Sequence, residues 1–408
     1  MHSINKLKIV NDPIYGFITI PNELIFALVE HPYFQRLRRI SQMGLSYLVY
    51  PGAHHTRFHH ALGAMHLASK ALDVLDFKGV PISEKERESL LAAVLLHDIG
   101  HGPFSHAIEH SIVLGVSHEQ LSLLFMQQLN DELGGQLDMA IEMFTQEYSR
   151  PFFYQLISGQ LDVDRLDYLK RDSFYTGVSE GAINSERLIS MLNVHEEKLV
   201  LEEKAIYSVE KFIIARRLMY WQVYLHKTGI VAEQLLIRVL MRARQLVQLG
   251  HQLDMSAELR YFMEQEEIED FNPGMLDLFA RLDDSDILWA LKQWTGNADM
   301  VLSRLANMIL NRNLLKIKIR EISFSPAEVD RHLRLIMEEY DMSREEAGYF
   351  VFTGSILNQA YNMEKDAIVL LSKSGEVMDV AQASDQLNLR ALSTPVEKFY
   401  LCSPKPVY

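Results

Sequence analysis

The sequence is almost without cysteine: Cys402 is the one thiol among 408 residues, so no disulfide can form within the chain. This usage is typical of proteins that fold in a reducing compartment. The first residues, MHSINKLKIVNDP, lack the apolar segment and the cleavage site of a secretory signal. We therefore expect a cytoplasmic protein, and we do not expect Cys402 to act as a nucleophile.

Positive charge is also scarce, since 40 Lys and Arg stand against 54 Asp and Glu and give a formal net charge of -14. An acidic surface disfavours broad binding to nucleic acid or to an anionic membrane, so an anionic substrate would need a local positive pocket. The apolar run of residues 90–96 is far shorter than the roughly 20 residues that cross a bilayer. The GxxxxGK[ST] phosphate loop is absent, which excludes that route to nucleotide binding.

Hydrophobic residues, 48% of the chain, follow mainly helical spacing. We expect helices over residues 23–30, 32–43, 61–75, 88–98, 118–131, 136–146, 150–158, 162–172 and 207–248, with more between 251 and 315. Residues 9–20 predict a β-hairpin, and LLKIKIREISF and the turn at 374–375 predict strands near the C-terminus. The sequence thus predicts a mainly α fold, with a helical domain over residues 1–315 and a small α+β lobe over residues 316–408.

Histidine is concentrated in HHTRFHH, residues 54–60, which holds four of the 16 in the chain. Imidazole can bind a metal, carry a proton or fill a polar position in the core. Only His60 is expected to bind a metal, because candidate partners for it lie further along the chain. His54, His55 and His59 are expected to lie in a loop or behind the ligands.

The stretch LLAAVLLHDIGHGPFSH, residues 90–106, is the richest in possible ligands. A helix that is apolar almost all round would be buried and would end in His97 and Asp98. The glycines that follow break the helix and let His101 and His106 turn back toward the same point. A lone His-Asp pair at a helix end could instead be a cap.

Further donors are expected from LDVDRLDYLKRD, where Asp164, Tyr168 and Asp172 are spaced by four residues and share one helix face. That face could instead be solvated and held by ion pairs. Two His and two Asp suit a transition metal such as Mn, Fe, Zn or Ni, and suit Mg less well. Such an ion can activate water and polarise a phosphoryl oxygen. The cations that could neutralise phosphates are Arg57, Arg165, Arg216 and Lys227, although each alone could be structural.

The order His60, His97-Asp98, Asp164 resembles the H…HD…D signature of the HD-domain metal phosphohydrolase superfamily. The segments NDPIYG, FQRLRRISQMG, YPGAHHTRFHHALG, HDIGHGPFSH, SHEQ and DVDRLDYLKRD occur in the order typical of its deoxynucleoside triphosphate triphosphohydrolases, a branch that includes the vertebrate enzyme with a sterile-alpha-motif domain. The resemblance covers residues 8–230, and we expect no sterile-alpha-motif domain before the HD segment. It implies a helical HD core and metal-dependent hydrolysis of a deoxynucleoside triphosphate to deoxynucleoside and tripolyphosphate.

The resemblance also implies roles for single residues. Those assigned to the metal are His60, His97, Asp98 and Asp164. Those near the triphosphate are Arg57, His101, Arg165 and Arg216. Those in the acid/base group beside the leaving 5′-oxygen are His106, Glu109 and His118, with His101 counted among the catalytic residues. Those that bind the sugar and base are Gln42, Met43, Tyr168, Asp172 and Tyr224.

Some positions depart from the family pattern. Glu109 replaces a shorter Asp, and Tyr220 and Leu225 replace more polar residues of the pocket, so the base preference stays open. The positions that match an effector-nucleotide site for tetramer assembly are Lys8, Gln35 and Arg38, with Glu30 in place of an Asp. Arg36, Arg38 and Arg39 could instead form a solvated helix face.

The expected partners are therefore a deoxynucleotide substrate, an effector nucleotide and further copies of the chain, as a dimer or a tetramer. Neither a membrane nor a nucleic acid is expected. Two other functions stay open from the sequence: hydrolysis of another phosphate ester, such as a nucleoside monophosphate or an alarmone, and a nucleotide-sensing, oligomeric regulator.

Overall fold

The computed structural model describes residues 8–104, 106–109, 111–265, 268, 271–363, 367–385 and 392–405, and at residue 106 it describes the backbone alone. The fold is mainly α-helical, as expected, and the residues in these ranges also form three small sheets. Within the described ranges, no helix combines the length and the apolar character that a membrane span requires.

The N-terminal part begins with the expected hairpin, in which β1 (Lys8–Asp12) and β2 (Gly16–Ile20) pair antiparallel. Asn22 caps the next helix by accepting a hydrogen bond from the Ile25 amide, as expected. The helices up to residue 190 are α1 (Glu23–Glu30), α2 (Pro32–Gln35), α3 (Arg57–Phe77), α4 (Glu84–Leu96), α5 (His106–Glu109), α6 (His118–Glu132), α7 (Asp138–Phe144), α8 (Pro151–Ile157), α9 (Val163–Thr176) and α10 (Ser185–Ser190). The 3-10 helices there are η1 (Arg36–Arg39), η2 (Gly44–Leu48) and η3 (Ser179–Gly181).

The second half adds helices and most of the strands. Its helices are η4 (Glu203–Ala205), α11 (Ile206–Met219), the π-helix η5 (Tyr220–Tyr224), α12 (Lys227–Gln248), α13 (Ala257–Glu264), α14 (Pro273–Phe279), α15 (Asp284–Trp294), α16 (Met300–Leu310), α17 (Pro326–Tyr340), α18 (Arg344–Gly348) and α19 (Val380–Ala383). Its strands are β3 (Leu192–His195), β4 (Lys198–Glu202), β5 (Lys316–Arg320), β6 (Phe352–Asn358), β7 (Val369–Leu371), β8 (Val377–Asp379) and β9 (Val396–Ser403).

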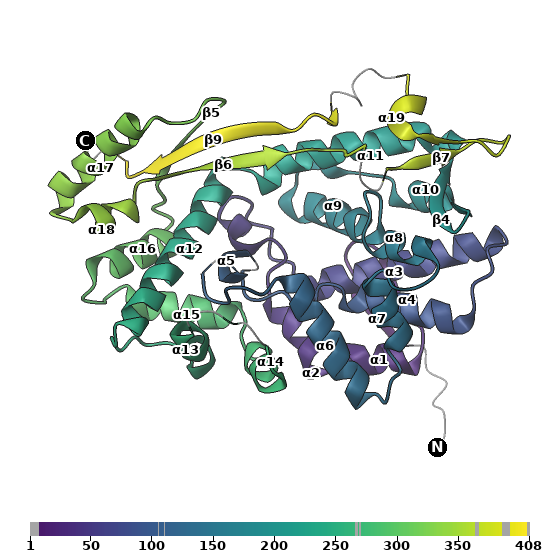
Figure 1. Ribbon diagram of the computed structural model, residues 1–408, viewed down its shortest axis with the longest axis horizontal. Helices are drawn as coiled ribbons and strands as arrows, with labels where there is room; N and C mark the ends of the chain where they lie inside the picture. The colour runs from purple at the N-terminus through teal and green to yellow at the C-terminus, as the bar shows by residue number, and fades with distance from the viewer. Residues whose placement is uncertain are drawn as a thin grey trace.

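Three helices pack together as one group, with α3 against both α4 and α9 (Figure 1). α4 begins at the expected capping box, where Ser83 accepts from the Glu86 amide and Glu86 accepts from the Ser83 amide. From Leu90 to Leu96 every residue of α4 is buried, as its uniformly apolar sequence indicates. These helices therefore deliver their polar ends to fixed places inside a rigid core.

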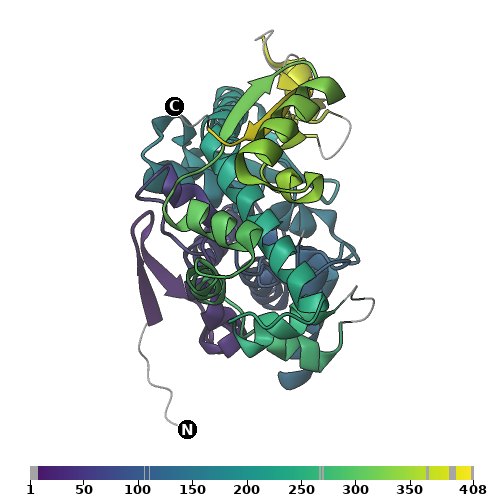
Figure 2. The same cartoon turned by 90° about the vertical axis from the view of Figure 1, so that its left-hand side faces the viewer.

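The sheets lie at the edges of this helical body. β5, β9 and β6 form an antiparallel sheet along one side of the molecule, and the purple hairpin β1–β2 lies at another edge (Figures 1 and 2). β7 and β8 pair as expected at the turn near Gly375, and β7 also pairs in parallel with β4, with Leu201 opposite Leu370. The strands after residue 315 are thus joined to the helical part, and the division of the chain at residue 316 stays a prediction.

Two expected helices were wrong in their extent. The helix that starts at Pro32 tightens into η1 and ends at Arg39, because Ser41 pairs with Thr56 and donates its amide to Asp284. The expected long helix over 207–248 is divided into α11 and α12 by the π-helix η5. Tertiary contacts and an irregular turn decided both cases, and neither leaves a clear periodic signal in the sequence.

Candidate active site

The first turn of α3 brings His60 and Arg57 into the core. Thr56 precedes the helix, and its amide donates to Nδ1 of His59 over 3.2 Å. His59 therefore lies in the helix and caps its start, where a loop position was one expectation. His60 is fully buried and Arg57 is 6% exposed, so both side chains act inside the protein.

Four expected ligands meet where α3, α4 and α9 converge. Nε2 of His60 lies 3.1 Å from Asp164 Oδ1 and 3.7 Å from Asp98 Oδ2. Nε2 of His97 lies 3.4 Å from Asp98 Oδ1 and 3.7 Å from Asp164 Oδ1. The ligand atoms of His60, His97 and Asp164 all lie within 4.8 Å of one another. The structure thus gathers two imidazoles and two carboxylates around one point.

These side chains fit a divalent metal ion. The Nε2 atoms of His60 and His97 are both buried without a hydrogen-bond partner among the described residues. The other ring nitrogen of each is held, because His97 Nδ1 lies 2.7 Å from the Val94 carbonyl and His60 Nδ1 lies 2.8 Å from Asp167. This arrangement fixes the tautomer that presents Nε2 to a metal. Burial lowers the pKa of His60, but the neighbouring carboxylates of Asp164 and Asp167 outweigh it and raise that pKa to about 10, so a bound cation would replace a proton there.

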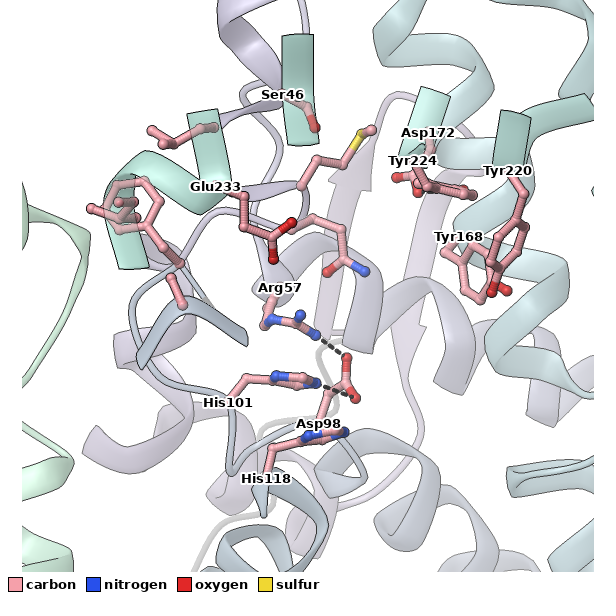
Figure 3. Close-up of a pocket in the computed structure, with 18 of the residues that line it drawn as sticks. Ser46, Arg57, Asp98, His101, His118, Tyr168, Asp172, Tyr220, Tyr224 and Glu233 are labelled. Atoms are coloured by element: carbon pink, nitrogen blue, oxygen red, sulfur yellow. Dashed lines mark hydrogen bonds and ion pairs between the residues drawn. The ribbon is translucent and has the colours of Figure 1, made fainter. Parts of the chain in front are cut away.

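The guanidinium of Arg57 and the imidazole of His101 flank the carboxylate of Asp98. Arg57 Nη1 donates to Asp98 Oδ2, and His101 Nε2 lies 3.4 Å from Asp98 Oδ1 (Figure 3). Burial and the nearby Arg57 cation lower the pKa of His101 to about 3, so its imidazole is neutral near pH 7. His101 can therefore donate or accept one hydrogen bond toward a substrate without carrying charge.

A second group of polar side chains lies beside the first. His101 stacks on His118 with ring centroids 4.0 Å apart, and His118 Nδ1 lies 2.8 Å from Glu109 Oε1. Glu109, which is longer than the Asp of the family pattern, thus contacts His118 directly. The side chain of His106, the expected proton donor, lies outside the described residues.

Arg36 holds the turn between these two groups. It is 1% exposed and donates to the carbonyls of Ile99 and His101 over 2.5 and 3.0 Å. Its guanidinium lies near the rings of Phe125 and Phe279, 5.2 Å from the centroid of each. The solvated face that was one expectation for Arg36 is therefore wrong, and the residue stabilises the turn after Asp98.

A cavity of about 510 Å³ opens over the cluster. Arg57, Asp98, His101 and His118 gather at one end, and the tyrosines lie at another (Figure 3). The expected site residues that line it are Gln42, Met43, Arg57, Asp98, His101, His118, Asp164, Arg165, Tyr168, Asp172 and Tyr224. Tyr220 and Glu233, the latter not anticipated from the sequence, also line it.

Asp172 and Arg165 are already engaged with other parts of the protein. The Asp172 carboxylate interacts with His55 Nε2 over 2.6 Å and accepts from Tyr224 Oη over 2.8 Å. Arg165 donates to Asp162 at the start of α9. His55 is thus a buried partner of Asp172, which lines the cavity. This is consistent with a position of His55 behind the residues that form the cavity wall.

Other expected residues lie elsewhere. Arg216 does not line the cavity, although it is near Tyr220 at 6.0 Å from that ring. Lys227 and Leu225 line a separate cavity with Trp221 and Lys398.

The expected effector-site residues are outside the cavity as well. Arg38 Nε donates to Gln35 Oε1 over 2.8 Å, which brings these two together. Lys8 pairs with Glu23 at 3.3 Å, and Glu30 is exposed at the end of α1.

The sequence did not single out Asp167, Arg171 or Asp12, which stand behind His60. Asp167 and Arg171 lie in the expected motif DVDRLDYLKRD, three and seven residues after Asp164, and are both buried. An acid and a base four residues apart on one expected helix were the available signal. The third residue, Asp12, is remote in sequence, so only the fold could connect it.

The sequence and the structure both have relatives. Residues 57–171 match the HD domain, and residues 183–259 match the HD associated region. A solved phosphohydrolase from Bacteroides thetaiotaomicron is 49% identical, with a TM-score of 0.95, over 98% of this chain and 100% of that one. The uncharacterized protein YwfO of Bacillus subtilis is 32% identical over 93% of this chain and 88% of its own length.

Another relative, matched over a smaller share of this chain, has a more specific name. The deoxynucleoside triphosphate triphosphohydrolase SAMHD1 homolog of Dictyostelium discoideum is 33% identical over 60% of this chain and 51% of its own length. The matched HD segment contains the four expected metal ligands, which the structure brings to one point. The chain therefore belongs to the HD-domain phosphohydrolases.

Proposed function

We propose that this protein hydrolyses deoxynucleoside triphosphates to deoxynucleoside and tripolyphosphate, with a divalent metal held by His60, His97, Asp98 and Asp164. The observation that carries the proposal is a single cavity that is lined by two of these ligands, Asp98 and Asp164, together with arginines and tyrosines. Its volume of about 510 Å³ falls within the roughly 300–1,000 Å³ of small-molecule sites. Similarity to a relative named a deoxynucleoside triphosphate triphosphohydrolase supports this substrate.

In this proposal the phosphates lie at the end of the cavity where Arg57, Arg165 and the ligands are found. When bound, the metal would polarise the phosphoryl oxygens and help to generate the nucleophile. Arg57 and Arg165 place positive charge beside the α-phosphorus, where negative charge builds up during the attack by water. Because both guanidiniums are already oriented by carboxylates, little rearrangement is needed during the reaction.

The leaving deoxynucleoside needs a proton on its 5′-oxygen. We assign this proton to His106, with Glu109 and His118 as the other members of the acid/base group. Water adds its oxygen to the α-phosphorus, the bond to the 5′-oxygen breaks, and the products are an alcohol and tripolyphosphate. The hydrogen bond of 2.8 Å between Glu109 and His118 supports this group, because it fixes the orientation of the imidazole.

The sugar and base are assigned to the other end of the cavity. Tyr168 and Asp172 would bind the ribose 3′-hydroxyl, while Gln42, Met43 and Tyr224 would contact the sugar and base. The Asp172 carboxylate is held by His55 and Tyr224, so it is already oriented for an incoming hydroxyl. Arg216, whose guanidinium lies 6.0 Å from the Tyr220 ring, is also assigned to the phosphates.

The proposal includes regulation by an effector nucleotide bound near Lys8, Glu30, Gln35 and Arg38, and assembly into a dimer or tetramer. A cytoplasmic location is part of the same proposal. The metal is proposed to be Mn, Fe, Zn, Ni or Mg, with a transition metal favoured by the two imidazole ligands.

The decisive experiment incubates purified protein of known metal content with the four dNTPs, singly and as a mixture, and separates the products. We expect tripolyphosphate and deoxynucleoside, and we expect Asp98→Ala to reduce turnover at least ~10³-fold, because charge stabilisation by the metal is lost. The mixture is needed because an effector requirement would hide activity on a single dNTP. Orthophosphate from a monophosphate or an alarmone, with all dNTPs intact, would replace the proposal by the other phosphohydrolase activity. Binding of nucleotides without any turnover would favour a regulator.

A further inference from the structure

A chain of buried charges extends from the back of the candidate metal site to the N-terminal hairpin. Asp167 is fully buried on α9 and does not line the cavity. Its Oδ2 lies 2.8 Å from Nδ1 of His60, the nitrogen that faces away from the expected metal. Asp167 therefore sets the orientation of the His60 ring without reaching the substrate.

Arg171 binds Asp167 in a bidentate ion pair. Its Nε and Nη2 donate to the two carboxylate oxygens of Asp167, each over 2.9 Å. A two-pronged pair of this kind fixes the carboxylate in both position and rotation. Both side chains are fully buried, so water does not screen or replace the interaction.

The third member comes from a part of the sequence 159 residues away. Arg171 Nη1 donates to Oδ2 of Asp12 over 2.8 Å, and Asp12 is the last residue of β1. The other oxygen of Asp12 accepts from the amides of Ile14 and Tyr15 over 2.8 and 3.0 Å. One carboxylate thus closes the hairpin turn and anchors the hairpin to α9.

Gly63, one helical turn after His60, makes room for the buried ion pair of Asp167 and Arg171. A Cβ atom at Gly63 would lie 2.0 Å from Asp167 Oδ1 and 2.2 Å from Arg171 Nη2. Both of those atoms are locked in the ion pair and buried, so they cannot move aside as surface side chains would. The glycine lets α3 approach α9 closely enough for His60 to meet Asp167.

We propose that Asp12, Arg171 and Asp167 form a positioning network that aims His60 Nε2 at the metal and couples docking of the hairpin β1–β2 to metal retention. The proposal rests on the metal site of the proposed function and not on its substrate. Coupling of this kind is reciprocal: if the docked hairpin strengthens metal binding, the metal must stabilise the docked hairpin by the same factor.

The first experiment titrates metal-free protein with Co²⁺ and follows its visible absorption, which reports ligand geometry as well as affinity. For Asp167→Asn we expect roughly 10–100-fold weaker binding, the effect common for partners of metal-bound histidines, together with an altered spectrum. For Asp12→Asn, which touches no ligand, we expect about 5-fold weaker binding, below the range expected for the direct partner of a metal-bound histidine. The matched control is Asp73→Asn on α3, whose partner is Arg87 in an exposed pair at 2.8 Å. The control should bind Co²⁺ as the wild type does.

The second experiment needs no substitution and stays informative if a variant fails to fold. Amide hydrogen exchange over residues 8–20 of the wild-type chain is compared with and without Co²⁺. Slower exchange in the hairpin on Co²⁺ binding supports the coupling. Unchanged exchange there, or folded Asp12→Asn that binds Co²⁺ as tightly as the wild type, overturns it. Neither readout involves turnover, so a failure here is distinct from a wrong substrate.

Discussion

At the scale of single residues, the candidate site depends on orientation as much as on identity. His60 and His97 each have one ring nitrogen held by a partner and the other buried at the ligand cluster. His101 is held neutral by burial and by Arg57, so it has a different role from the ligands only a few ångströms away. Three histidines of the same site are thus differentiated by their surroundings.

The pair Glu109–His118 gives a prediction at this scale, since Glu109→Gln removes a charge but keeps the size. We expect kcat to fall about 100-fold, within the usual range for a group in acid/base catalysis, with metal content unchanged. Glu119→Gln is the matched control, because Glu119 lies 3.2 Å from the other ring nitrogen of His118 but is 64% exposed. Steady-state kinetics and metal analysis would test both variants. Equal losses in the two would show that Glu109 has no special role.

At the scale of elements, helix ends decide where the polar side chains lie. α4 is fixed at its start by the capping box of Ser83 and Glu86, and its other end carries His97 and Asp98. Glu86 also accepts from Arg150 over 2.7 Å and from Tyr148 over 2.9 Å. One carboxylate therefore ties α4 to the segment before α8.

Glu86 makes part of the stability depend on pH. Burial raises its pKa, but hydrogen bonds from the Ser83 backbone and the Arg150 side chain outweigh this and hold the pKa at about 2, below its ordinary 4.5. The stabilisation is complete above pH 4.5 and is lost as the pH falls toward 2, because the unfolded chain takes up the proton first. We expect Glu86→Gln to lower the free energy of unfolding by roughly 2 kcal/mol at pH 7 and by much less near pH 3. Urea unfolding at both pH values measures this, with exposed Glu84→Gln as the control; a difference independent of pH would contradict it.

Gly100 gives a second prediction for elements, because it lets the turn after Asp98 touch the start of α6. A Cβ atom there would lie 2.2 Å from the His118 carbonyl oxygen and 2.3 Å from the Ser122 amide nitrogen, both backbone atoms. Gly100→Ala should therefore push α6 and His118 away, at a cost of at least about 2 kcal/mol in unfolding free energy, with lower turnover. Gly348→Ala is the control, since no atom lies within 4 Å of a Cβ at that position. A stable and active Gly100→Ala would show that the turn can shift freely.

At the scale of the whole molecule, the segment after residue 315 is joined to the helical part at several places. β7 pairs with β4, β5 contacts α12, and Arg238 of α12 lies over the Phe352 ring at 3.5 Å. The same α12 lines the candidate site through Glu233. Packing of the C-terminal strands therefore supports α12, which forms one wall of the cavity.

Removal of residues 316–408 tests this dependence. We expect the shortened chain to melt at a lower temperature and to lose most of its turnover, because β4 and one face of α12 become exposed. Thermal unfolding followed by circular dichroism, with a metal titration of the same sample, measures both effects. A shortened chain that keeps the wild-type melting temperature would instead show that residues 1–315 are an independent domain.

The sequence by itself determined the family resemblance, the mainly helical fold and the expected ligands, since short motifs and helix caps depend on local spacing. It missed the break of α11 and α12 at η5, the burial of Arg36 and the network of Asp12, Arg171 and Asp167. Each of these depends on contacts between segments that are far apart in the chain. Only the tertiary structure decides them, because a side chain's charge, burial and partner are set by neighbours that packing supplies.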